Sequence, residues 1–286
     1  MFDPSQYQLL DFGQGRKLEQ FGDHLLDRPS PAAEDAERLL DAEAWGRAET
    51  RYVRRKAGTG EWSPAWKADH RWAITHASVQ LELKPTNFGH LGVFPEHAAV
   101  WDWVAKRIRA ASDKTVRVLN LFAYTGAATL AAAAAGAEVT HVDSAQNVVQ
   151  WARRNAELSG LEEAPVRWIA EDAMRFAQRE LKRGRSYHAI ILDPPTYGHG
   201  PKGETWKVVR DLAPLLETCA ELTRDSLEFV FLSCHSEGYG PAELEAELLR
   251  AFFGNSCQAG GKAGAMQLAT QDGRRLNCGH FARWPA

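Results

Sequence analysis

The amino-acid sequence predicts an α/β fold in which a seven-stranded parallel sheet with helices on both faces follows a small β-rich N-terminal unit. From about residue 116 onward, short apolar runs alternate with amphipathic helical stretches, which is typical of a parallel sheet covered on both faces. The preceding part contains short β-like runs broken by turn sequences such as AGTG and SP. We therefore predict an accessory domain at residues 1–95 and a main domain at residues 96–286.

Apolar runs predict five strands in the main domain, and two weaker runs near the C-terminus complete the sheet. The strands are expected at residues 116–123, 138–143, 166–170, 187–193, 228–234, 265–270 and 278–284. Helices are expected between them at residues 126–136, 145–160, 173–184, 204–222 and 241–253. Connections of this length fit right-handed crossovers between parallel strands.

Composition excludes several classes of protein. Apolar residues at 44% and charged residues at 25% are ordinary for a globular chain, so extensive disorder and a fibre are excluded. The net charge of −3 means that any contact with nucleic acid must come from a local basic patch. The start of the chain has no secretory pattern, and no apolar run is long enough to span a bilayer, so we expect a cytoplasmic protein with no membrane partner.

The four cysteines predict reduced thiols rather than a metal site. Cys219, Cys234, Cys257 and Cys278 form no CxxC pair and have no histidine at zinc-finger spacing, so no metal is expected. The sequence leaves the oligomeric state open, with a homodimer as one option.

The stretch ILDPPTY indicates a functional edge of the sheet. Proline lacks a backbone N–H, so Asp193 is the last residue that can take part in the ladder. Pro194 and Pro195 then hold the following backbone extended, which places Asp193 and the ring of Tyr197 at a fixed rim.

Acids and a glycine turn follow the other predicted strands. Gly126 lies where the first strand turns into a helix, Asp143 ends the second strand, and Asp172 follows the third. Gly126 alone is a weak signal and Asp172 alone is typical of a helix cap, but ligands of α/β sheets collect at the carboxyl ends of strands. Together with Asp193 these residues predict a site for a nucleoside-type cofactor. The turn lacks the later glycines of the dinucleotide motif, which disfavours a pyrophosphate.

These motifs resemble those of class I S-adenosylmethionine-dependent methyltransferases. The resemblance is strongest to the family that contains bacterial 23S ribosomal RNA large-subunit cytosine-5 methyltransferases and their unassigned relatives. It rests on NLFAYTGAATLAAAAAGAEVTHVDSAQNVVQWARRNAELSG, EDAMRF and ILDPPTYGHGPKG, with GHLGVFPEH as a segment that precedes the first motif. The resemblance implies a Rossmann-like methyltransferase sheet, S-adenosyl-L-methionine as cofactor, and RNA as substrate.

The resemblance also implies roles for individual residues. The loop at residues 122–126 would pack around the methionine part of the cofactor, Asp143 would hold the ribose hydroxyls, and Asp172 would bind the adenine amine. Asp193 would face the sulfonium. The complete set of implied cofactor residues is Phe94, Asn120, Phe122, Ala123, Tyr124, Thr125, Gly126, Asp143, Ser144, Asp172, Ala173, Asp193 and Pro194.

Two chemistries remain open for the methyl acceptor, and transfer to carbon 5 of cytosine is the one we favour from the sequence. Carbon 5 of cytosine is a poor nucleophile that is usually activated by a thiolate, and Cys234 ends the fifth predicted strand at the same edge as Asp193. We expect Cys234 and Asp193 to be catalytic in that case, although a cysteine finishing a strand is also typical of a core residue. Alternatively, Asp193, Pro195 and Tyr197 serve a guanine ring nitrogen, an exocyclic amine or a small molecule, without a covalent intermediate.

The N-terminal region contains the one basic and aromatic neighbourhood of the chain. Trp45, Trp62, Trp66 and Trp72 are interleaved with arginines that include Arg54 and Arg55. Such a pattern predicts contacts through phosphates and stacked bases with an RNA substrate, which the resemblance implies to be ribosomal RNA. The alternative is that the tryptophans form the core of this unit and the arginines a solvated face.

Overall fold

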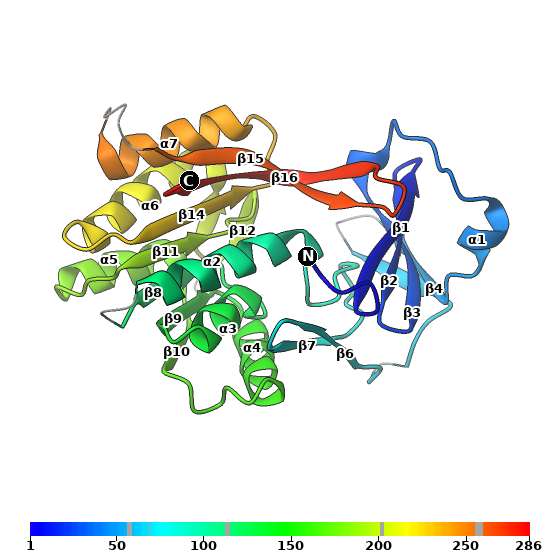
Figure 1. Cartoon of the computed structure of the whole chain (residues 1–286), viewed down its shortest axis with the longest axis horizontal. Coiled ribbons are helices and arrows are strands. Elements are labelled where there is room, and N and C mark those ends of the chain that lie inside the picture. The colour runs from blue at the N-terminus through cyan, green and yellow to red at the C-terminus, as the bar shows by residue number, and fades with distance from the viewer. Residues whose placement is uncertain (56–58, 68, 112–114, 201–202, 255–259) are drawn as a thin grey trace. The chain divides into compact units, whose positions relative to one another are not determined.

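The computed structural model describes residues 1–286 except residues 56–58, 68, 112–114, 201–202 and 255–259, so Cys257 lies outside the described residues. The described chain forms two compact units (Figure 1). The first comprises Met1–Ala99 and Gln267–Cys278, and the second comprises Val100–Met266 and Gly279–Ala286. The division into domains at residue 95 remains a prediction about which parts fold independently.

The second unit is built on a seven-stranded sheet, as predicted. The strands of this sheet are β8 (Arg117–Leu121), β9 (Glu138–Asp143), β10 (Val166–Ala170), β11 (Ala189–Leu192), β14 (Phe229–Cys234), β15 (Lys262–Ala269) and β16 (Arg275–Trp284). The end of β15 and the start of β16 belong to the first unit. Their order in the sheet is β10-β9-β8-β11-β14-β16-β15. The first five strands in this order are parallel, but β16 runs antiparallel to β14. The expectation of a wholly parallel sheet is wrong at this end, because the short connection between β15 and β16 allows only a hairpin.

The order of the strands creates a switch point between β8 and β11. From β8 the chain moves outward through β9 to β10, and it then returns to place β11 on the other side of β8. The loops that follow β8 and β11 therefore leave the sheet in opposite directions, and in open α/β sheets such a position at the carboxyl ends of the strands is where ligands bind.

Helices cover both faces of the sheet, as predicted (Figure 1). They are α2 (Ala98–Ala110), α3 (Ala127–Ala134), α4 (Gln146–Leu158), α5 (Ala173–Lys182), α6 (Val208–Thr223) and α7 (Pro241–Phe253). Successive residues of β11 serve different cores: Ile190 packs in the core under α5, α6 and α7, whereas Ile191 packs in the core under α2 and α3. None of the helices formed by described residues is long and apolar enough to cross a membrane.

The sequence missed two features of this unit. Helix α2 was not predicted, and the helix expected from residue 204 begins only at Val208. Residues Thr205–Lys207 instead form strand β13, which pairs with strand β12 (Tyr197–His199) in a two-stranded hairpin. Trp206 in this hairpin is buried, and its packing outweighs the helical preference of the segment.

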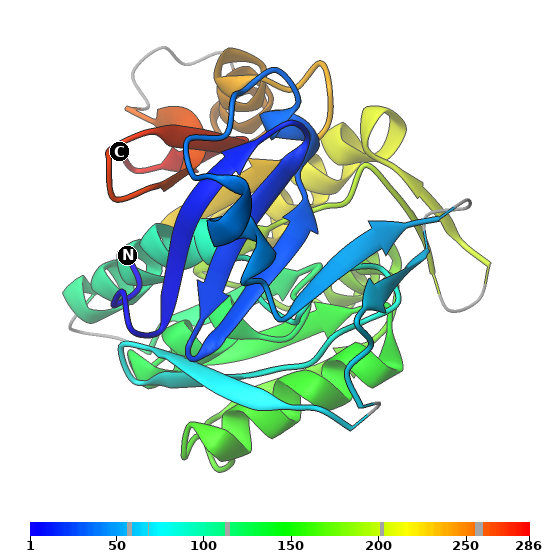
Figure 2. The ribbon, with the colours of Figure 1, turned by 90° about the vertical axis from the view of Figure 1, so that its right-hand side faces the viewer.

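The N-terminal unit is β-rich, as predicted (Figure 2). Its sheet contains β1 (Tyr7–Gly13), β2 (Arg16–Phe21), β3 (His24–Pro29), β4 (Thr50–Arg54) and β5 (Gly60–Ser63) in sequence order, beside a hairpin of β6 (Trp72–His76) and β7 (Val79–Leu83). Short helical turns lie at α1 (Ala42–Gly46), Pro31–Ala33 and Pro95–His97. Neighbouring strands are antiparallel except β3 and β4, which are parallel.

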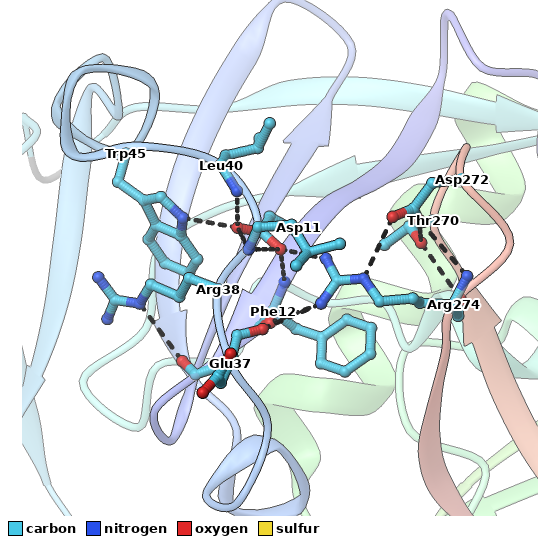
Figure 3. Close-up of polar contacts among 11 residues, drawn as sticks. Asp11, Phe12, Glu37, Arg38, Leu40, Trp45, Thr270, Asp272 and Arg274 are labelled. Atoms are coloured by element: carbon cyan, nitrogen blue, oxygen red, sulfur yellow. Dashed lines mark hydrogen bonds and ion pairs between the residues drawn. The ribbon is translucent and has the colours of Figure 1, made fainter.

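A buried carboxylate ties three segments of the N-terminal unit together (Figure 3). Asp11 is fully buried and accepts hydrogen bonds from the Leu40 amide at 2.9 Å, the Trp45 indole at 2.9 Å and the Arg274 guanidinium. Burial alone would raise the pKa of Asp11, but these donors together lower it below its usual value. Trp45 is therefore a core residue, and the alternative interpretation of the tryptophans is correct at this position.

Candidate active site

A pocket lies at the carboxyl ends of β8, β9, β10 and β11. It brings together six residues that the sequence singled out: Phe122, Asp143, Ser144, Asp172, Ala173 and Pro195. These six residues end or follow four strands, β8, β9, β10 and β11. The shared polarity of the parallel strands is therefore what gathers residues that are far apart in the chain. Trp206, Glu171 and His199 also line this pocket and were not foreseen.

Asp143 is the most constrained acid of the pocket. One carboxylate oxygen accepts the Tyr124 amide and the other accepts the Ala145 amide, each at 2.9 Å. Burial raises the pKa of Asp143, and these two hydrogen bonds only partly offset the rise. Because an ionised carboxylate offers about four acceptor positions, Asp143 can still accept hydrogen bonds from the hydroxyl groups of a ligand.

The loop between β8 and α3 has an unusual backbone. Phe122 and Tyr124 adopt positive φ angles of 56° and 50°, and Gly126 follows with a φ of 88°. Positive φ is uncommon in residues other than glycine and is concentrated at functional loops. At Gly126 a Cβ atom would lie 3.0 Å from the Cβ atom of Ala152, which is a tight contact. The positive φ together with this close approach of α4 favours glycine at the turn.

Ala123 and Thr125 are the remaining predicted residues of this loop, and their backbone groups bind the structure beneath it. The amide of Ala123 donates to the carbonyl of Val142 at 3.0 Å, and the carbonyl of Thr125 accepts from the Asn155 side chain at 2.9 Å. Ala123 and Thr125 are both buried. These contacts fix the loop, and they do not place either side chain on the pocket wall.

Asn120 belongs to a buried polar network under the loop. Its side-chain amide donates to the Thr129 hydroxyl at 2.9 Å, and the same hydroxyl lies 2.9 Å from Nδ1 of His141. Burial lowers the pKa of His141 to about 3, so this imidazole is neutral. Asn120 is 2% exposed, and the structure shows it as a support of the loop.

Asp172 both lines the pocket and caps a helix. Its side chain accepts the amide of Arg175 at 2.9 Å, which satisfies one free N–H at the start of α5. The two interpretations of Asp172 from the sequence are therefore compatible. Ala173 follows directly and is buried against the pocket.

Asp193 follows β11 at the same edge and is held by the neighbouring strand β14. The Ser233 hydroxyl donates to one of its carboxylate oxygens at 2.6 Å, and Nε2 of His235 lies 3.5 Å from the same oxygen. Pro194 is buried, which anchors the chain just after the acid. The carboxylate is thus positioned by side chains that the sequence did not identify as site residues.

The rim beyond Asp193 presents an exposed aromatic ring. The carbonyl of Pro195 accepts the Trp206 indole at 2.7 Å, and the Trp206 ring packs on Phe122 with centroids 4.8 Å apart. Tyr197 is 52% exposed, and its hydroxyl lies 3.2 Å from Nε2 of His199. Trp206 therefore links the two strand-end loops. In the sequence Trp206 lies in the stretch GETW, which predicted the start of a helix.

Cys234 lies on the face of β14 opposite to that of Ser233. It is fully buried and packs with Leu192 and Leu232 in the core under α5, α6 and α7. Because side chains alternate along a strand, the hydroxyl of Ser233 reaches Asp193 while the thiol of Cys234 points into this core. The role of Cys234 as a nucleophile remains a prediction.

Three further predicted residues belong to the N-terminal unit. Phe94 and Arg54 line a pocket within that unit, and Arg55 forms an ion pair with Glu61. Their roles toward cofactor and substrate stay predictions.

Comparisons with known proteins agree with this geometry. Residues 27–237 match the S-adenosylmethionine-dependent methyltransferase family. The crystal structure of the SAM-dependent methyltransferase from Agrobacterium tumefaciens is 36% identical, with a TM-score of 0.90 over 98% of this chain and 90% of that one. A Streptococcus mutans structure, 17% identical, shares the fold with a TM-score of 0.74 over 98% of this chain and 75% of that one.

Relatives by sequence carry a more specific name. The ribosomal RNA large subunit methyltransferase K/L of Shewanella baltica strain OS155 is 30% identical over 179 residues, which is 62% of this chain and 24% of the relative. The protein of the same name from Hahella chejuensis is 38% identical over 146 residues, 50% of this chain and 19% of the relative. The chain thus spans about a quarter or less of the length of these relatives.

S-adenosylmethionine matches the hydrogen-bonding groups that line the pocket. The cofactor carries no phosphate, in agreement with a strand-end loop that lacks the dinucleotide glycines, and its ribose can donate to the spare acceptor positions of Asp143. The chain belongs to the S-adenosylmethionine-dependent methyltransferase family and is an enzyme of that class.

Proposed function

We propose that this enzyme methylates a base of RNA, that the RNA is ribosomal, and that the reaction takes place in the cytoplasm. The names of the K/L relatives support the substrate class. The rim formed by Asp193, Pro195 and the exposed ring of Tyr197 supports a base as the methyl acceptor, since a base turned out of its stack can pack on such a ring.

In this proposal the strand-end residues bind the cofactor. Asp143 accepts the ribose hydroxyls, Ser144 lies beside the adenine, and Asp172 with Ala173 binds its amine. The loop at residues 122–126, supported by Asn120, encloses the methionine part, and Phe94 with Asp193 and Pro194 completes the set. S-adenosylmethionine supplies an electrophilic methyl group on its sulfonium, so the protein chiefly has to align acceptor and methyl.

The burial of Cys234 favours a nitrogen of the base as the acceptor. A ring or exocyclic nitrogen needs no covalent help, and Asp193, fixed by Ser233, can accept the hydrogen bond of the target N–H. Transfer to carbon 5 of cytosine is the second candidate. It requires the thiol of Cys234 to leave the apolar core and add to the base.

Replacement of Cys234 tests which chemistry operates. The full chain is incubated with tritiated S-adenosylmethionine and total RNA from cells that lack the gene, and the labelled nucleoside is identified by mass spectrometry. With a nitrogen acceptor, Cys234→Ala should retain transfer within about threefold, because only a core contact is lost. With carbon 5 as acceptor, transfer should fall on the order of 10³-fold or more.

Cys219→Ala is the matched control, because this thiol is also fully buried in the same core, on α6. Cofactor binding by calorimetry shows whether either variant is folded. If the enzyme binds S-adenosylmethionine but labels no RNA, a small-molecule acceptor replaces RNA in the proposal.

A further inference from the structure

A second pocket lies entirely within the N-terminal unit and combines positive charge with aromatic rings. It is formed by β2, β3, β4 and the segment after β7. The residues that matter here are Lys17, Arg28, Arg54, Phe88 and Glu96.

A buried carboxylate fixes two of the cations. Glu19 is fully buried, and its carboxylate lies 3.0 Å from Nζ of Lys17 and 2.6 Å from the guanidinium of Arg28. Burial would raise the pKa of Glu19, but Arg28 and Lys17 together lower it, so the acid stays ionised. Two cations share one anion, and the pair therefore leaves a net positive charge on the pocket wall.

Arg54 adds a cation that the unit does not use internally. It lies at the end of β4 and is exposed, and its guanidinium makes no ion pair or hydrogen bond with the residues that the structure describes. His90, also in the pocket, contributes no charge at neutral pH. His90 is exposed at the pocket, and partial desolvation together with the nearby cations Arg28, Lys17 and Arg54 lowers its pKa below the usual value.

An aromatic ring is presented on a rigid turn beside these cations. Phe88 is 62% exposed and lies in a turn closed by hydrogen bonds from the Gly89 amide to Thr86 at 3.1 Å and from the Thr86 amide to His90 at 3.1 Å. Gly89 has a φ of 78°, and a Cβ atom there would lie 2.7 Å from the ring of Tyr52. The hydroxyl of Tyr52 also donates to the carbonyl of Asn87 at 2.7 Å, which anchors the turn. Phe88 is therefore held outward at low entropic cost.

Glu96 supplies an acceptor in the same pocket. Its Oε2 atom is buried and has no hydrogen-bond partner among the described residues. A buried acceptor without a donor is costly unless a ligand provides one. The exocyclic amine of a base or a ribose 2′-hydroxyl is a suitable donor.

We propose that this pocket binds one unpaired nucleotide of the RNA substrate other than the methylated base. This inference rests on the proposed function. Phe88 stacks on the base, Arg54 and the Lys17–Arg28 pair face the phosphates, and Glu96 accepts from the base or the ribose. Single-stranded RNA is favoured over duplex RNA, because the faces of paired bases are already covered by their neighbours.

Fluorescence anisotropy with a labelled 12-nucleotide RNA of mixed sequence tests the pocket in the full chain. Phe88→Ala should weaken binding about tenfold at unchanged salt dependence, because a stacked base is lost. Arg54→Ala should weaken binding and lower the salt slope by about one, because one phosphate contact is lost. A duplex of the same sequence should bind more weakly to the wild type and should not respond to Phe88→Ala.

Two variants in the same unit serve as matched controls. Leu39→Ala removes an apolar side chain of similar exposure, 61%, and Arg47→Ala removes a cation that pairs with Glu43 on α1. Both should bind RNA as the wild type does, and all four variants should keep their affinity for S-adenosylmethionine.

The pocket and the proposed function can fail separately. Wild-type affinity in both Phe88→Ala and Arg54→Ala, or no binding of the probe by the wild type, overturns the pocket whatever the methylation assay shows. Loss of RNA affinity in these variants together with an absence of methyl transfer to total RNA leaves the pocket standing and overturns the proposed function.

Discussion

The two edges of the seven-stranded sheet carry opposite chemistry. At the amino edge, a cavity of about 580 Å³ is lined by three arginines, Arg117, Arg167 and Arg185. At the carboxyl edge, a pocket of about 70 Å³ is lined by the strand-end acids Asp143 and Asp172. The larger cavity is thus not the one at which the motifs of the family converge. In this fold the direction of the strands locates the site, and cavity size does not.

The polar groups of the two edges also differ in how far they are already satisfied. At the amino edge, Arg117 donates to the carbonyl and the hydroxyl of Ser186, each at 3.1 Å, and Arg167 donates to the buried Glu180 at 3.0 Å. These bonds give the arginines at the strand ends partners within the protein. At the carboxyl edge, Asp143 accepts one amide at each oxygen and keeps acceptor positions for a ligand.

Removal of Asp143 should have the largest effect of any change at either edge. We expect Asp143→Ala to weaken S-adenosylmethionine binding about 100-fold, because two charge-assisted hydrogen bonds to the ribose are lost. Isothermal titration calorimetry measures the affinity directly.

The same substitution leaves the amides of Tyr124 and Ala145 without an acceptor, so the loop itself could loosen. Asp143→Asn is the control, since it keeps the volume and one acceptor oxygen. An affinity close to that of the wild type in both variants would remove Asp143 from the site and with it the contrast between the two edges.

Much of the carboxyl edge could be predicted from the sequence, because its signals are local. Gly126 and Asp143 stand next to strand ends that the apolar runs define, and proline fixes where β11 must stop. A glycine or an acid directly after a strand predicts a turn or a ligand contact from the local sequence alone, independently of tertiary contacts. The seven strands and the helical cover followed from periodicity for the same reason.

What the sequence did not reveal depends on contacts between distant segments. Ser233 reaches Asp193 only because β14 lies beside β11, and Trp206 forms a strand rather than a helix because it packs on Phe122. The register of β14 decides on which face of the sheet the Cys234 side chain lies, and a sequence alone does not fix this register to a single residue.

The pH dependence of cofactor binding should sharpen the contrast between the two edges. Because burial raises the pKa of Asp143 above its ordinary 3.8, the acid protonates at a higher pH than an exposed aspartate does. In the proposed site the ribose hydroxyls donate to this carboxylate, so affinity should be complete above the raised pKa and fall up to about tenfold for each pH unit below it. Binding should correspondingly lower the pKa of Asp143, so protons should be released on binding at pH values near and below the raised pKa.

The raised pKa of Asp143 makes the stability of the ligand-free protein depend on pH in the opposite direction to cofactor affinity. Without ligand, the raised pKa means that the neutral form of Asp143 favours the fold below pH 3.8, and that this contribution is lost as the pH rises through the folded-state pKa. The rise in Tm that S-adenosylmethionine causes should therefore grow from acid toward neutral pH. Asp143→Asn should show little of this pH dependence, and an equal dependence in this variant would assign it to another group.

The smallest effect is expected at the amino edge. Arg185 lines the large cavity, and its guanidinium makes no ion pair or hydrogen bond with the described residues, so Arg185→Ala should leave S-adenosylmethionine affinity within about 1.5-fold of the wild type. Calorimetry at two salt concentrations excludes a long-range effect of the lost charge, which screening would reduce. A large loss of affinity would mean that cofactor binding draws on both edges. Strand direction would then no longer suffice to locate the site.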